Sequence, residues 1–378
     1  MLSIEKVDTA NKAQVRRLVE LPHRLYRDCP QWVPPLNLDA YNQLNPQKHP
    51  FYEHSDVEFF LAVRDGRDVG RIAAIENRPF NQYHHAKEAN FYFFECENDP
   101  EAAAALFNTV FEWAKTRGLD CAVGPKGMGP LDGYGIQVLG FEHRQTMTML
   151  AYNYPYYQEL IEAQGFVKEV DFVSCYLPAD KFQIPERVER IARRAAERSG
   201  LAVKKFKSKK ELVGWADKIG EAYNKAFVNN WEYFPFTKRE IDFVVENILT
   251  VADHRLIKIV THGDEAVGFL FAFHDVSAAL QRARGKLNPF TLADLLLEMR
   301  RTRTVAVNGM GILPEYHGKG GNALLYSEMG RTLLEFRQFS HVEMTQVAES
   351  AEQMRADLRN LNGVEYKNYR VFRKTLEG

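Results

Sequence analysis

The sequence has few of the features that mark disulfide-rich, metal-binding or membrane-spanning proteins. Only four of its 378 residues are cysteine, and they are scattered, without a CxxC pair or a zinc-ligand spacing. No apolar run approaches the ~18 residues of a membrane span, and the first residues, MLSIEKVDTANK, lack the apolar core of a signal peptide. We therefore expect reduced thiols, no bound metal and a soluble, cytoplasmic protein.

An excess of charge of one sign is also missing. Lys and Arg number 49 and Asp and Glu 50, which gives a formal net charge of -1. No overall field then attracts nucleic acid or an anionic membrane, and neither is expected as a partner. A hydrophobic content of 45% is typical of a globular protein with a sizeable core. The length favours about two domains.

A strand–turn–strand pattern occurs twice. FFLAVRDGRDVGRIAAI (59–75) resembles RLIKIVTHGDEAVGFLFAF (255–273), and each contains a Val-Gly pair after an Asp/Gly turn. The two glycines, Gly70 and Gly268, are 198 residues apart (268 − 70). The similarity predicts two equivalent hairpins.

A helix–glycine–strand pattern recurs at the same offset. YYQELIEAQGFVKEVDFVSCYL (156–177) resembles MRADLRNLNGVEYKNYRVFRKTL (354–376), and Gly165 and Gly363 are again 198 residues apart (363 − 165). Two landmarks with one offset favour tandem copies of an α/β unit. Two unrelated domains that share common hairpins are the alternative. A charged helix ending at Gly200 places the boundary near residue 180, which gives domains 1–180 and 181–378.

A glycine cluster lies between a predicted strand and a predicted helix in the second copy. TVAVNGMGIL (304–313) is typical of a buried strand, and NALLYSEMGRTLLEFR (322–337) of an amphipathic helix. HGKGG (317–321) connects them. Free N–H groups and the helix dipole at such a junction favour an anion. Neither GxxxxGK[ST] nor GxGxxG is present, and a glycine turn without a ligand is the alternative.

The stretch PEYHGKGGNALL resembles the pyrophosphate loop, [Q/R]xxGx[G/A], of the GNAT superfamily of N-acyltransferases. His317 takes the Gln/Arg position, Gly320 the invariant glycine position, and Asn322 stands where Gly or Ala is usual. CPQWVPPL, FFECENDPEAAAALF, YNYPYYQELIEAQGF and NNWEYFPFT resemble a bacterial family with two tandem GNAT-like domains. The resemblance implies a mixed α/β (α+β) fold with two units, each a mostly antiparallel central sheet flanked by helices.

The resemblance also implies a binding site for acetyl-CoA, as co-substrate, in the second unit. Backbone groups of Met310, Gly311 and Ile312 would bind the acyl carbonyl and the pantetheine arm. The loop would hold the pyrophosphate through His317, Gly318, Lys319, Gly320, Gly321 and Asn322.

The first copy has acidic residues where its own loop would lie. Glu95, Glu97, Asp99 and Glu101 follow the strand NFYFF, and no glycine opens the backbone there. Carboxylates at this place would repel a pyrophosphate, whereas they are favourable as caps of a helix N-terminus. We expect a degenerate GNAT-like first domain without a pyrophosphate loop.

Catalysis would need a base near the thioester. HVEMTQVA (341–348) alternates as a strand, which puts Glu343 on one face with His341 and Thr345. Glu343 is the candidate base, and a carboxylate paired at the sheet surface is the alternative. The GNAT tyrosine position falls on Arg359, and the asparagine common after this strand is missing from ESAEQM (349–354). Tyr326 is a candidate substitute for the tyrosine or a core aromatic.

Two further segments have two interpretations each. NNWEYFPFT (229–237) predicts either an aromatic wall for an amine or packing between the two halves. GPKGMGPLDGYG (124–135) predicts a long loop across the sheet or a loop that holds a ligand. Asp275, in an insertion between strands, is a candidate contact for a cationic amine.

The sequence thus predicts an N-acyltransferase whose C-terminal domain transfers an acetyl or other acyl group from CoA to a primary amine of a small molecule or peptide. The alternative is a non-catalytic GNAT-fold protein that binds a small molecule or a protein. The intact glycine loop favours the first, and the missing Tyr and Asn favour the second.

Overall fold

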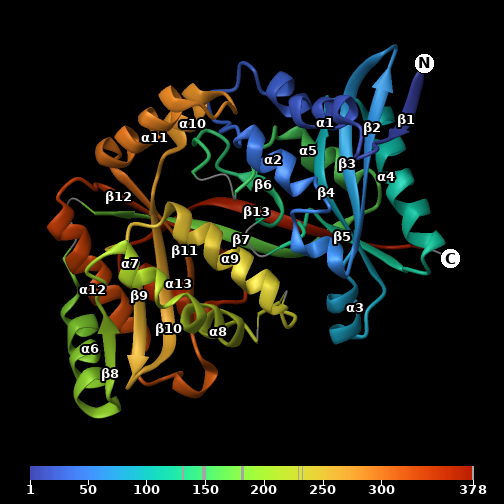
Figure 1. Cartoon of the computed structure of the whole chain (residues 1–378). Helices are drawn as coiled ribbons and strands as arrows, with labels where there is room; N and C mark the ends of the chain where they lie inside the picture. Colours follow the sequence, from blue (N-terminus) through green and yellow to red (C-terminus); the bar gives the residue numbers. More distant parts are fainter. Residues whose placement is uncertain (130–131, 147–149, 180–182, 229, 232, 377–378) are drawn as a thin grey trace.

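The computed structural model describes every residue except 130–131, 147–149, 180–182, 229, 232 and 377–378 (Figure 1). The first half of the chain contains β1 (Leu2–Lys6), α1 (Lys12–Leu25), α2 (Asn37–Gln43), the 3-10 turn η1 (Pro50–Glu53), β2 (Asp56–Arg64), β3 (Arg67–Glu76), α3 (Arg78–His84), β4 (Glu88–Cys96), α4 (Pro100–Thr116), β5 (Cys121–Gly124), β6 (Ile136–Leu139), α5 (Tyr156–Glu162) and β7 (Val167–Pro178).

The second half contains α6 (Glu186–Ser199), β8 (Leu201–Lys204), α7 (Lys209–Val213), α8 (Ala216–Ala226), α9 (Lys238–Val251), β9 (Ile257–His262), β10 (Glu265–His274), α10 (Ser277–Ala283), α11 (Pro289–Arg301), β11 (Thr304–Ile312), the 3-10 turn η2 (Pro314–Tyr316), α12 (Gly321–Phe336), β12 (His341–Ala348), α13 (Glu352–Asn360) and β13 (Val364–Thr375). The helix predicted to end at Gly200 is α6, and Gly200 adopts the left-handed conformation after it.

Both halves arrange their strands in the same way. β1 to β4 form an antiparallel meander, and β5 lies parallel to β4. β8 to β11 repeat this order, and β12 lies parallel to β11. The predicted fold class, a mixed α/β fold of two units with mostly antiparallel strands flanked by helices, is confirmed.

The two predicted hairpins are equivalent. Gly70 lies in β3 opposite Ala62 of β2, and Gly268 lies in β10 opposite Val260 of β9. Each glycine also faces the next strand, where its partner is Cys96 or Ile312. The correspondence predicted from the 198-residue offset (268 − 70) is therefore confirmed for these strands.

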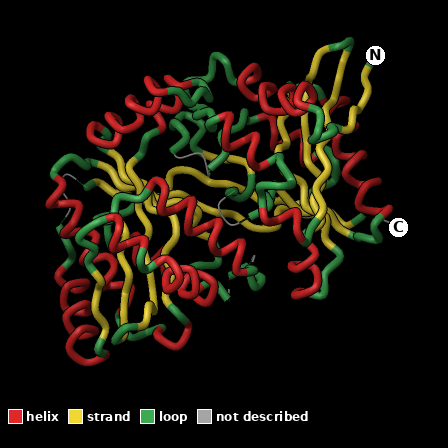
Figure 2. The backbone as a smooth tube through the Cα atoms, viewed as in Figure 1, coloured by secondary structure: helices red, strands yellow, loops and turns green. Residues whose placement is uncertain are grey.

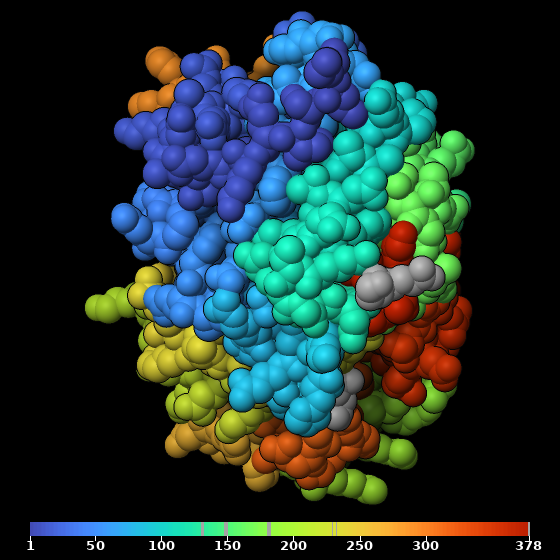
Figure 3. All heavy atoms as spheres, turned by 90° about the vertical axis from the view of Figure 1, so that its right-hand side faces the viewer, coloured from blue at the N-terminus to red at the C-terminus, as the bar shows by residue number. Residues whose placement is uncertain are grey.

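The last strands of the two halves are exchanged. β13 pairs with β5 of the first half, β7 pairs with β12 of the second, and β7 and β13 pair antiparallel between them. A single 13-stranded sheet results (Figure 2). In Figure 3 the C-terminal atoms, in red, lie beside teal and green atoms of the first half. The domains 1–180 and 181–378 therefore share their last strands, and this division of the sequence stays a prediction.

The exchange is also visible in the cores. Phe372 and Leu376, from the end of the chain, belong to the apolar cluster around α4 and α5 in the first half. Val173, Cys175 and Leu177 of β7 belong to the cluster around α6 and α12 in the second half. Each half therefore depends on apolar side chains that the other half supplies.

Helices cover both faces of the sheet (Figure 2). In the second half α12 and α6 pack together on one face, and α8 and α9 cover the other. No helix in the described part of the chain is long and apolar enough to cross a bilayer.

Phe372→Ala is expected to destabilise the protein by about 3–5 kcal/mol. Phe372 comes from the second half of the sequence, but its side chain is fully buried in the core of the first half. Urea unfolding measures the loss, and hydrogen exchange should show reduced protection in α4 and β5. Phe290→Ala is the matched control, since Phe290 is 87% exposed. A loss confined to the second half would contradict the strand exchange.

Candidate functional site

The predicted glycine loop lies exposed between η2 and the start of α12. His317 donates from Nε2 to the carbonyl of Ile312 at 2.8 Å, which fixes the loop against the end of β11. Gly318 and Gly320 both have positive φ, +74° and +86°. No side chain caps α12 at Gly320, so the first N–H groups of this helix lack a side-chain cap.

The loop residues have two different environments. A Cβ on Gly320 would meet Ala195 of α6 at 2.9 Å, whereas nothing lies within 4 Å of a Cβ on Gly318. Lys319 is exposed, and its ammonium lies 4.6 Å from the centre of the Tyr316 ring. The open side of the loop therefore combines a lysine with unshielded backbone N–H groups, which suits an anion.

The strands β11 and β12 separate beside this loop. They pair in parallel from Thr304 with His341 to Val307 with Met344, and no further pair joins them. Met310, Gly311 and Ile312 pair with β10 on one side only. Their edge toward β12 lacks strand pairing, and Gly309 takes a φ of +99° where β11 turns away. The two strands stop pairing after Val307, whereas β11 continues to Ile312, next to the loop.

Glu343 is on the sheet face opposite α12. Its neighbours Val342 and Met344 pack in the α12 cluster, so Glu343 points to the other face. The carboxylate is 2% exposed, and its Oε1 lies 3.1 Å from the ammonium of Lys367 in β13. Lys367 also donates to the carbonyl of Arg144 at 2.9 Å. Burial lowers the pKa of Lys367, and the Glu343 carboxylate acts in the opposite direction.

Two hydroxyl groups on α12 are buried without a hydrogen-bond partner, those of Tyr326 and Ser327. Burial raises the pKa of Tyr326. Arg359, which occupies the GNAT tyrosine position, is exposed on α13. Tyr326 also belongs to the apolar cluster around α6 and α12, which supports its alternative interpretation as a core aromatic.

The corresponding loop of the first half is closed by ion pairs. Asp99 caps α4 by accepting from the N–H of Ala102, as predicted for these acids. Arg64 binds Asp99 and Glu101, and Arg24 and Arg67 bind Glu97.

Glu95 is held differently, in the core of the first half. It accepts from the hydroxyls of Tyr26 and Tyr157 at 2.6 and 2.8 Å. The N–H of Cys96, at the end of β4, donates to the hydroxyl of Tyr157 at 3.1 Å. The Tyr157 hydroxyl therefore takes up the N–H of Cys96, and the absence of a pyrophosphate loop from the first domain stays a prediction.

The aromatic segment after α8 packs against the first half. Trp231 lies near Tyr134 and Phe172, with ring centroids 6.2 and 6.0 Å away. Phe234 meets Phe80, and His84 donates to the carbonyl of Tyr233 at 2.7 Å. Asn229 and Glu232 lie outside the described residues. Of the two interpretations of this segment, packing between the halves is the one that these contacts support.

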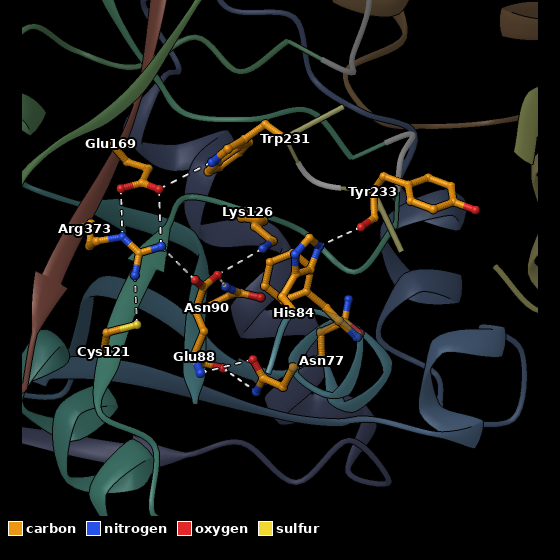
Figure 4. A network of polar contacts seen from close by, with 12 residues as sticks. Asn77, His84, Glu88, Asn90, Cys121, Lys126, Glu169, Trp231, Tyr233 and Arg373 are labelled. Atoms are coloured by element: carbon orange, nitrogen blue, oxygen red, sulfur yellow. Dashed lines mark hydrogen bonds and ion pairs between the residues drawn. The ribbon is translucent and has the colours of Figure 1, made fainter. Parts of the chain in front are cut away.

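A buried polar network lies beneath Trp231 (Figure 4). Glu88 of β4 binds Lys126 and Arg373, both at 3.0 Å. Arg373 of β13 binds Glu169 of β7 at 2.7 Å, and the Trp231 indole donates to Glu169 at 3.4 Å. The network therefore joins both exchanged strands to the first half. Sequence reasoning missed it because its members come from distant segments of the chain, although Lys126 and Trp231 lie in two of the segments singled out above.

Other sequence candidates have partners within the chain. Asp275 is 2% exposed and binds Arg144 at 2.7 Å. In the loop 124–135, of which residues 130–131 lie outside the described part, Asp132 accepts from the N–H groups of Met128 and Gly129. Among the described residues no group of His, Cys, Asp and Glu has the arrangement of a metal site.

These features define a class of protein. A tandem GNAT protein from the clavulanic acid biosynthesis pathway, without AcCoA, matches with a TM-score of 0.57 and 12% identity, over 100% of this chain and 99% of that chain. A GCN5-related glucosamine N-acetyltransferase region of a fungal multi-domain GH3 beta-N-acetylglucosaminidase matches with a TM-score of 0.54 and 10% identity, over 99% of this chain and 38% of that chain. The protein has the tandem GNAT fold.

No family model matches the chain. Two curated proteins are similar over almost the whole length. "Bacterial ceramide synthase" of Caulobacter vibrioides (strain NA1000 / CB15N) is 29% identical over 99% of this chain and 98% of that protein. "Protein YghO" of Escherichia coli (strain K12) is 25% identical over 97% and 94%. Together the comparisons support an acyltransferase-like function.

Gly320→Ala is expected to destabilise the protein by at least ~2 kcal/mol, because the left-handed backbone and the contact with Ala195 both penalise a Cβ. Gly318→Ala is the matched control and should cost about 1 kcal/mol, from the backbone alone. Thermal unfolding of both variants without any ligand measures the difference. Equal losses would mean that α6 does not constrain the loop.

Proposed function

We propose that the chain is an N-acyltransferase that uses an acyl-CoA as co-substrate and a primary amine as acceptor. The observation that carries the proposal is the position of the exposed loop 317–321 next to the diverging ends of β11 and β12. Oriented N–H groups at the start of α12 suit a pyrophosphate. The unpaired edge of Met310, Gly311 and Ile312 offers backbone groups to a thioester and its amide-containing arm.

Support for a particular acyl group comes from the relative rather than from the loop. A ceramide is a long-chain amino alcohol whose nitrogen carries a fatty acyl group. The similarity to a protein named bacterial ceramide synthase, which extends over 99% of the chain, favours a long acyl chain and a long-chain amino alcohol. Acetyl-CoA, the donor expected from the sequence, is an acyl-CoA with a shorter acyl chain.

Acyl-CoA supplies a thioester whose C–S bond breaks as the amine nitrogen forms its bond to the carbonyl carbon. We assign the acceptance of the amine proton to Glu343, on the face of the sheet away from α12. The ammonium of Lys367 lies 3.1 Å from that carboxylate in a buried place. We assign the protonation of the departing thiolate to solvent, because Tyr326 is buried in the apolar cluster on the α12 face of the sheet.

The second candidate is a GNAT-fold protein that binds without catalysis. One observation favours it: the Glu343 carboxylate already has a buried ammonium partner within the protein. The exposed Arg359 adds no acid at the GNAT tyrosine position. Both candidate functions allow CoA binding, but only the first predicts that an acyl group is transferred.

Gly318→Asp is expected to weaken CoA binding at least about tenfold, because it places a carboxylate beside the pyrophosphate. Gly318→Asn is the matched control: Asn has the same shape, tolerates positive φ and carries no charge. Thermal shift with CoA, acetyl-CoA and a long-chain acyl-CoA measures the effect, because a ligand that binds only the native state raises its stability. Equal thermal shifts for both variants would show that the loop does not bind the pyrophosphate.

Glu343→Gln is expected to lower kcat/KM by about 10²–10⁴-fold at unchanged CoA affinity. The substitution also leaves Lys367 buried without its partner, which costs about 3–5 kcal/mol of stability. The double variant Glu343→Gln with Lys367→Met removes that buried charge and separates the two effects. Its stability should recover while its activity stays low.

The assay tests acyl transfer from acetyl-CoA and from a long-chain acyl-CoA to a panel of short amines and long-chain amino alcohols. A double variant as active as the wild type would exclude Glu343 as the base. If CoA binds but no amine in the panel is acylated, the binding-protein function is the better conclusion.

A further inference from the structure

An insertion between β10 and β11, residues 275–303, forms a helical arm at one end of the sheet (Figure 1). We call it the α10–α11 arm. Its base is anchored in both halves: Gln281 donates to the carbonyls of Pro30 and Trp32, and Gln338 donates to those of Met299 and Thr302. The arm is therefore a fixed part of the folded protein.

The outer face of α11 is apolar and uncovered. None of the residues of α11, all of which the structure describes, is buried. Sixteen large apolar side chains are exposed in the described part of the chain, and five of them lie in this one stretch: Leu287, Phe290, Leu292, Leu296 and Leu297. Phe290 is 87% exposed. Such a concentration of apolar surface marks an interaction site.

The charges around this face have one sign. Residues 282–303 contain six basic side chains and two acidic ones. Both acids, Asp294 and Glu298, are bound to Arg282 of α10. The remaining basic residues are all exposed: Arg284, Lys286, Arg300, Arg301 and Arg303. The outer face therefore presents apolar side chains bordered by unopposed positive charge.

We propose that the α10–α11 arm docks the protein on the surface of an anionic lipid bilayer. A helix with an apolar face and basic borders lies in the plane of the headgroups, with the apolar side chains inserted and the cations at the phosphates. The net charge of -1 gives no long-range attraction, but the local charge acts within a Debye length of the surface. A second copy of the chain would bring the same positive border against itself.

This inference stands on the arm alone and does not depend on acyl transfer. Loss of activity in the Glu343 variants would leave it unchanged. If both are correct, docking would place the start of β11, at Thr304, next to a source of lipid-like acyl chains and amines.

Flotation with phosphatidylcholine vesicles, with and without phosphatidylglycerol, tests the proposal. The full chain should float with the anionic vesicles and detach at high salt. Phe290→Ser with Leu296→Ser should weaken vesicle binding at least about tenfold. Arg300→Gln with Arg301→Gln should weaken it about 30-fold and remove the preference for phosphatidylglycerol.

Control variants remove exposed apolar or basic side chains elsewhere on the surface. Val251→Ser with Val364→Ser replaces side chains that are 55 and 59% exposed, and Arg193→Gln with Arg194→Gln replaces adjacent exposed arginines of α6. Both should float like the wild type. The proposal is wrong if the wild type floats with neither kind of vesicle or if the controls lose binding equally. It is also wrong if sedimentation shows a dimer that the Phe290 and Leu296 substitutions dissociate, because the face would then join two copies.

Discussion

The antiparallel pairing of β7 with β13 is the interaction on which the rest of the molecule depends. These strands close the sheets of the opposite halves, and ion pairs reinforce them where they meet. Arg370 binds Asp171, its direct cross-strand neighbour, at 2.8 Å, and Arg373 binds Glu169 at 2.7 Å. Cross-strand pairs of opposite charge stabilise a sheet. Without this central pair neither half would have a complete sheet or core.

The same pairing makes the candidate site a joint product of both halves. β12 carries Glu343 and is flanked by β7 from the first half. Lys367 comes from β13, and its second acceptor, the carbonyl of Arg144, comes from a first-half loop. The first half has ion pairs where its own loop would lie, yet it still positions residues around the site of the second. The first half thus contributes structurally to the candidate site of the second.

Local elements such as strands and loops could be predicted from the sequence, but which strands pair with each other could not. The strand predicted at 341–348 and the glycine loop before α12 follow from alternation and from glycine, which act over a few residues. The exchange of β7 and β13 leaves no local signal, because an amphipathic strand suits either sheet. Lys367 illustrates the same limit: its burial depends on Glu343, which only the folded sheet brings near. The apolar face of α11 that is left uncovered is likewise seen only in the structure.

Strand exchange has a consequence for how the chain is made on the ribosome. β5 needs β13 at its edge, and Arg373 lies 252 residues after its contact Cys121. At the usual pace of translation, this partner emerges roughly 10–50 s after β5 has left the exit tunnel. During that interval β5 is an open edge next to an incomplete core, a state that is prone to aggregation. We expect the nascent first half to need chaperone protection until synthesis is complete.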